Sequence, residues 1–170
     1  GTLARIALVE ERSNVLRRSL EEAAEGRGEK TIVANADRMV IVAAAANPPP
    51  RVGMVDRCLV AAKEAGVPAL LCITKTDLAS PKDFLTNFKG FDLTVVTTEV
   101  VPDRGDEAEL GALPEALTGN LSVLVGHSGV GKSTLINALV TDADRAVGAV
   151  NAHTGKGRHT STSAVALPLD

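Results

Sequence analysis

The residues with the clearest chemical potential form a glycine-rich segment, Gly126–Thr134, which reads GHSGVGKST. It satisfies the pattern GxxxxGK[ST], in which glycines let the backbone turn so that successive amide N–H groups bind phosphate oxygens. Lys132 would neutralise the terminal phosphates of a nucleotide, and the hydroxyl of Ser133 would ligate Mg²⁺. The segment therefore predicts a nucleotide-phosphate site. Its predicted nucleotide-binding residues are Gly126, Ser128, Gly129, Val130, Gly131, Lys132, Ser133 and Thr134.

A second segment, Thr74–Asp77 (TKTD), resembles the [NT]KxD motif that selects guanine. An aspartate can accept hydrogen bonds from the ring N–H and the exocyclic amine of guanine, whereas adenine has no matching pair of donors. The stem of Lys75 can cover the face of the ring. We therefore predict that Thr74, Lys75 and Asp77 bind the base. An ATP-dependent kinase or ATPase with the same phosphate loop is the alternative, and it leaves this segment unexplained.

The elements that must position these residues alternate along the chain. Short continuous apolar runs predict buried strands, and helically spaced apolar residues predict the helices between them. The predicted strands are Met39–Ala46, Ala69–Thr74, Leu93–Thr97 and Leu121–Val125, and the predicted helices are Val52–Ala65, Pro81–Phe88, Glu107–Leu117 and Lys132–Val140. This alternation predicts an α/β fold, a doubly wound and mostly parallel sheet with helices on both faces. In such sheets the ligand binds beyond the carboxyl ends of the strands.

The two ends of the chain have weaker patterns. Thr2–Lys30 is expected to be a strand tail with a mobile charged segment, and Asp142–Thr162 is too rich in small polar residues for regular structure. The chain begins at Gly1 without methionine and stops at Asp170 in an apolar run. These features lead us to expect a piece of a longer protein.

Composition excludes several functional classes. The chain has 170 residues, enough for one sizeable core, and its 18 Lys+Arg against 21 Asp+Glu argue against a chain-wide attraction to nucleic acid. Only Cys58 and Cys72 occur, so neither a disulfide framework nor a Cys-rich zinc site is expected. No apolar run reaches the roughly 20 residues of a membrane helix, and no signal peptide is recognisable. The expectation is a cytoplasmic protein without membrane contact.

The order of the two motifs is unusual, because Asp77 precedes Gly126 whereas ordinary GTPases place the guanine motif after the phosphate loop. This order is typical of circularly permuted GTPases. From about Thr31 to Leu169 the chain resembles one bacterial family, the ribosome small-subunit-dependent GTPase A. The segments that carry the resemblance are Ala34-Asn35-Ala36-Asp37, Asn47-Pro48-Pro49, Asp56-Arg57, Lys75-Thr76-Asp77-Leu78, Gly126–Ser133 with His127-Ser128 where other permuted families carry Pro-Asn, and Gly157-Arg158-His159-Thr160.

The resemblance implies a P-loop GTPase fold and a GTP-binding, GTP-hydrolysing assembly factor for the small ribosomal subunit. GTP or GDP with Mg²⁺ would be the ligands, and contacts with ribosomal RNA would come largely from other domains. Gly155–Thr162 would be the first switch loop, in which His159 acts in hydrolysis together with Lys132. A hydroxyl there, assigned to Thr160 with Ser161 and Thr162 as alternatives, would join Ser133 on Mg²⁺.

The resemblance also divides the chain. Residues 1–30 are expected to be a remnant or linker from a preceding OB-fold domain, and residues 31–170 a circularly permuted GTPase domain that stops before the DxxG motif. Zinc is expected only in a carboxyl-terminal domain absent from this chain. Two departures stand out, since Thr74 replaces the usual Asn and Thr97–Glu99 matches the guanine-backing Ser-Ala poorly. A nucleotide-binding module without turnover is a further alternative.

Overall fold

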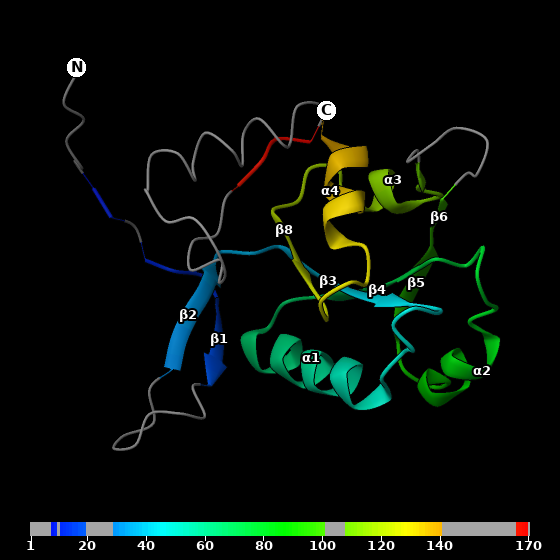
Figure 1. Ribbon diagram of the computed structural model, residues 1–170. Coiled ribbons are helices and arrows are strands. Elements are labelled where there is room, and N and C mark those ends of the chain that lie inside the picture. Colours follow the sequence, from blue (N-terminus) through cyan, green and yellow to red (C-terminus); the bar gives the residue numbers. More distant parts are fainter. Residues whose placement is uncertain (1–7, 10, 20–28, 101–107, 141–165, 170) are drawn as a thin grey trace.

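A four-stranded parallel sheet forms the centre of the computed structural model (Figure 1). The structure describes residues 8–9, 11–19, 29–100, 108–140 and 166–169. The strands lie in the order β5 (Thr94–Thr97), β4 (Ala69–Thr74), β3 (Arg38–Ala44) and β8 (Ser122–Val125). Because all four run in the same direction, the segments that follow them gather at one edge of the sheet.

Helices cover both faces of this sheet (Figure 1). One face packs against α1 (Val52–Ala65), α2 (Lys82–Leu85) and the short 3-10 helix η1 (Thr86–Phe88), and the other packs against α3 (Leu113–Leu117) and α4 (Lys132–Leu139). Alternate residues of β3 enter the two cores, as the two-residue period of a strand requires. The doubly wound arrangement predicted from the sequence is confirmed.

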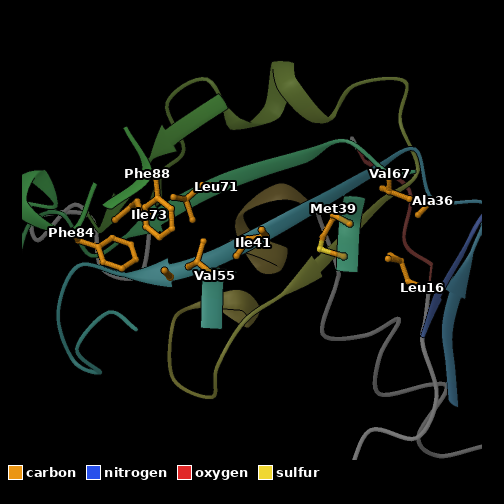
Figure 2. Close-up of a cluster of buried hydrophobic side chains, with 12 residues drawn as sticks. Leu16, Ala36, Met39, Ile41, Val55, Val67, Leu71, Ile73, Phe84 and Phe88 are labelled. Carbon is orange, nitrogen blue, oxygen red and sulfur yellow. The ribbon is translucent and has the colours of Figure 1, made fainter. Parts of the chain in front are cut away.

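The core below the sheet joins β3, β4 and α1, as Figure 2 shows. Ile41, Leu71, Ile73 and Val55 have no measurable exposure there. At the far end, the rings of Phe84 and Phe88 pack edge to face with centroids 5.3 Å apart. These β-branched and aliphatic residues supply the apolar burial that stabilises the sheet and fixes the ends of its strands.

The prediction of one helix over 107–117 is wrong in its first part. Residues 108–109 form strand β7 (Ala108–Glu109), which pairs antiparallel with β6 (Glu99–Val100). Gly111 then adopts a positive φ of 54°, and α3 begins only at Leu113 with Pro114 in its first turn. A proline has no amide hydrogen and suits a helix start, so Pro114 opens this helix. The predicted helix Pro81–Phe88 is likewise divided into α2 and η1.

The amino-terminal part is more regular than expected. Strand β1 (Val15–Ser19) pairs antiparallel with β2 (Glu29–Ala34), and Leu16 is buried in the same cluster as Met39. The prediction of a mobile charged segment in this region is therefore wrong for the residues that form β1 and β2. The domain boundary predicted between residues 30 and 31 lies inside β2 and stays a prediction.

In the part of the chain that the structure describes, no helix is long and apolar enough to cross a membrane. Across these same ranges, His, Cys, Asp and Glu side chains form no cluster of three that could hold a metal ion. Cys58 and Cys72 are free thiols, and burial raises the pKa of both, that of Cys72 to about 12. A thiol with so high a pKa stays protonated and unreactive at neutral pH.

Candidate nucleotide-binding site

The glycine-rich segment lies between β8 and α4, where a phosphate loop must lie. Gly129 and Gly131 have positive φ values of 80° and 98°, a conformation that favours glycine. Gly126 is required for a different reason: a Cβ there would lie 2.3 Å from the carbonyl oxygen of Val42 on the neighbouring strand. The three glycines therefore allow a tight turn closely packed on the sheet.

Helix α4 begins at Lys132, and its first helical hydrogen bond runs from Leu135 N to Gly131 O at 2.9 Å. The amides of residues 132–134 precede that bond and stay available to an anion at the helix start. Lys132 Nζ donates to the carbonyls of Gly126 and His127, both at 2.8 Å. Partial burial lowers the pKa of its ammonium. The loop thus places the ammonium of Lys132 beside the amides at the start of α4, and a nucleotide phosphate requires both a positive charge and backbone donors.

Ser133 and Thr134 lie in the first turn of α4 and are exposed. The Ser133 hydroxyl is therefore free to face a cation bound to a phosphate held by the loop, which fits its predicted role toward Mg²⁺. His127 is exposed and its Nδ1 lies 3.0 Å from the carbonyl oxygen of Ser128, so it belongs to the loop rather than to the buried core.

The predicted guanine motif follows β4 at the same edge of the sheet, directly beside this loop. Thr74 is buried, and its hydroxyl donates to the carbonyl of Val130 at 2.6 Å. Lys75 Nζ donates to the carbonyl of Gly129 at 2.8 Å and also to that of Asn47. The motif replaces its usual Asn by Thr74, yet a hydroxyl donor still joins it to the phosphate loop.

Asp77 is exposed. Within the described residues, no donor reaches its carboxylate, which leaves both oxygens available to a ligand. The neighbouring loop is held in place by Thr76, whose amide donates to Thr98 O at 3.5 Å and whose hydroxyl lies 3.3 Å from the same oxygen. The Thr76 hydroxyl also lies 3.4 Å from a carboxylate oxygen of Glu99. The segment predicted to back the guanine, despite its poor match, therefore lies against the base motif.

Other predicted residues lie outside the described part of the chain, namely His159 and Thr160 in the expected switch loop. Their roles stay predictions. Conversely, sequence reasoning gave no role to Asn47 and Pro48, which contact the site. The signal available was the Asn47-Pro48-Pro49 segment, which contributed to the resemblance without a function attached.

Together these features define a P-loop nucleotide-binding protein in which the base motif precedes the phosphate loop in sequence and lies beside it in space. The family model of the RsgA GTPase matches residues 9–170. The chain therefore belongs to the RsgA GTPase family, which confirms the resemblance inferred from its motifs.

Individual relatives agree with this assignment. The chain is 43% identical over 143 residues to the small ribosomal subunit biogenesis GTPase RsgA of Azotobacter vinelandii, covering 79% of this chain and 40% of that protein. It is 36% identical over 169 residues to the protein of the same name from Chlorobaculum parvum, covering 96% of this chain and 53% of that one. The chain thus spans about half the length, or less, of these relatives.

Solved structures show the same fold. The crystal structure of YjeQ from Thermotoga maritima has a TM-score of 0.56 and 28% identity, covering 77% of this chain and 43% of that one. YloQ, described as a circularly permuted GTPase, has a TM-score of 0.51 and 26% identity, covering 76% and 42%. These likenesses support the predicted permuted arrangement of the sheet.

Proposed function

We propose that this chain binds GTP and GDP and hydrolyses GTP as part of an assembly factor that acts in the cytoplasm on the small ribosomal subunit. The observation that carries the proposal is the base motif itself: Thr74 and Lys75 are bonded to the phosphate loop, and Asp77 of the same motif is exposed, with no donor to its carboxylate among the described residues. Relatives named as small ribosomal subunit biogenesis GTPases support the same role. Contacts with ribosomal RNA are assigned mainly to parts of the longer protein outside this chain.

In the proposed complex, Asp77 accepts hydrogen bonds from the ring N–H and the amine of guanine. The amides at the start of α4 and the ammonium of Lys132 hold the phosphates. Ser133 and Thr160 are the proposed ligands of Mg²⁺, an ion that neutralises phosphate charge when it is bound. His159 is proposed to orient or deprotonate the attacking water.

The guanine assignment is tested by calorimetric titration with GDP and ADP in Mg²⁺ buffer. We expect titration with GDP to release or absorb heat on binding and titration with ADP to give no heat of binding. Asp77→Asn should weaken GDP binding about 10- to 100-fold, because hydrogen bonds to a charged group are lost. The same variant should bind xanthosine diphosphate better than GDP, since the amide can donate to the oxygen that replaces the guanine amine. Equal binding of ADP, or no switch in a folded Asp77→Asn variant, would favour the ATP-dependent alternative.

Turnover is tested separately on the whole protein, with and without small ribosomal subunits. His159→Ala should reduce subunit-stimulated GTP hydrolysis about 100-fold or more, in the range of general-base contributions, while GDP affinity stays unchanged. Unchanged hydrolysis in this variant would remove His159 from the mechanism. Absence of hydrolysis in the wild type would instead identify a nucleotide-binding module without turnover.

A further inference from the structure

We propose that the turn of residues 47–50 is a positioning element of the nucleotide site, which orients the tip of the phosphate loop toward the β-phosphate. This inference rests on the proposed function, because it concerns how the same site holds its nucleotide. The turn follows β3, so it lies at the edge of the sheet where the segments after β4 and β8 also meet.

The first observation is a bridge made by one ammonium group. Lys75 Nζ donates to the carbonyl of Gly129 in the phosphate loop and to the carbonyl of Asn47 in the turn. Three segments that are distant in sequence are thus joined by a single cation. Lys75 and Asn47 also have positive φ values of 59° and 45°, a conformation that is uncommon for lysine and that surrounding contacts must maintain.

The second observation is the proximity of Pro48 to the phosphate loop. The ring of Pro48 lies 3.7 Å from the position that a Cβ on Gly129 would occupy. A small hollow between the turn and the phosphate loop is lined by Pro48 and Pro49 on one side and by His127 and Val130 on the other. The turn therefore lies next to the phosphate loop, and Pro48 faces the open side of Gly129.

The consequence follows from the geometry of the peptide bond. A trans peptide is planar, and its C=O and N–H groups point in opposite directions. Because the Gly129 carbonyl accepts a hydrogen bond from Lys75 Nζ, the amide of Val130 in the same peptide must face away from that ammonium. The Thr74 hydroxyl fixes the next peptide in the same manner through Val130 O. The turn and the base motif together hold two successive amides in the orientation that a phosphate-binding concavity needs.

The test compares GDP with GMP, which lacks the β-phosphate, on the whole protein. Pro48→Ala should weaken GDP binding about 3- to 10-fold, the range of one ordinary hydrogen bond, mainly through faster dissociation. GMP affinity should change less than about twofold. Pro49→Ala is the control, because Pro49 is exposed, belongs to the same turn and has no atom within 4 Å of the Cβ position on Gly129. A purely structural role would lower both affinities and the melting temperature together.

Lys75→Met gives a second measurement that substitutes no residue of the turn. It removes the ammonium bridge, and the ratio of GDP to GMP affinity should fall as it does for Pro48→Ala. An unchanged ratio in both variants, with GDP still bound by the wild type, would overturn this inference alone. Failure of the wild type to bind GDP would overturn the proposed function and this inference with it.

Discussion

At the residue scale, two glycines of the same chain are expected to respond oppositely to the same substitution. Gly126→Ala places a methyl group 2.3 Å from Val42 O, so the loop or the strand must shift. We expect a loss of about 1–3 kcal/mol in the free energy of unfolding, measured with urea. Gly53→Ala in α1 is the control, because nothing lies within 4 Å of the added carbon and alanine favours a helix. It should raise stability by about 0.5–1 kcal/mol.

If Gly126→Ala unfolds at the same urea concentration as the wild type, the close approach of the phosphate loop to β3 is wrong. GDP affinity of the folded Gly126→Ala variant should also fall, because the loop amides move with the backbone. That second result separates a displaced loop from a general loss of packing.

Lys132 leads to a prediction about pH. Burial lowers the pKa of its ammonium in the free protein, whereas a bound phosphate favours the charged form and raises that pKa again. Between these two pKa values the complex holds more protons than the free protein, so binding takes up a proton. GDP affinity should therefore fall as pH rises through the lowered pKa toward the ordinary lysine value of about 10.4. Below the lowered pKa, Lys132 is charged in both states and contributes no pH dependence.

Titration calorimetry in buffers of different ionisation enthalpy measures this proton uptake. Lys132→Arg is the control, since a guanidinium stays charged over the whole range and the titration of the nucleotide itself is common to both proteins. An identical pH dependence in wild type and Lys132→Arg would assign the effect to the nucleotide and contradict the prediction.

Sequence reasoning at this scale found the residues but not their partners. Glycine and lysine at fixed spacing indicate a phosphate loop, because the tight turn requires glycine and the phosphates require a positive charge. The bridge from Lys75 to Asn47 joins segments that no local pattern connects. Such contacts depend on the register of three parallel strands, which only the folded sheet determines.

At the scale of elements, helices and strands with a long apolar pattern were predicted well, whereas the two-residue strands β6 and β7 were not. Helix α1 has the predicted bounds Val52–Ala65, and Gly66 ends it with a positive φ of 68°. Strand β4 also has its predicted bounds, because a run of five apolar residues followed by Thr74, with five of the six residues buried, leaves little ambiguity. Strand β7 has only two residues and exists through its pairing with β6. A two-residue strand carries no periodicity, so the sequence favoured helix there.

The placement of β8 beside β3 depends on polar contacts that the apolar pattern of the sequence does not predict. Asp37 N donates to the carbonyl of Leu121 at 2.8 Å, and Leu121 N donates back to the Asp37 carboxylate at 2.8 Å. Arg38 adds a bond from its guanidinium to the carbonyl of Ala116, at the end of α3. These contacts fix the start of β8 and therefore the position of the phosphate loop at its other end.

At the scale of the whole molecule, the permuted order of motifs is compatible with an ordinary site because parallel strands meet at one edge regardless of their order in sequence. The base motif follows β4 and the phosphate loop follows β8, with β3 between those strands. The sequence predicted this convergence. The sequence did not predict the pairing of β1 with β2 in the amino-terminal segment, because charged residues interrupt the apolar pattern there.

We expect the cooperative folding unit to extend toward the amino terminus as far as β1. Leu16 of β1 is only 3% exposed and shares a buried cluster with Ala36, Met39 and Val67 (Figure 2). The Asn14 amide also exchanges two hydrogen bonds with the backbone of Ala36, at 2.9 and 3.0 Å. We therefore expect Leu16→Ala to lower the free energy of unfolding by about 2–4 kcal/mol.

Urea unfolding of Leu16→Ala should remain a single transition, followed both by circular dichroism and by loss of GDP binding. Ile32→Ala on β2 is the matched control: Ile32 is 43% exposed, so the same kind of truncation should cost less than about 1 kcal/mol. A separate early transition in Leu16→Ala, with GDP binding retained after it, would mean that β1 and β2 fold independently of the nucleotide site. A single transition would instead place β1 and β2 in the cooperative unit that holds the nucleotide site.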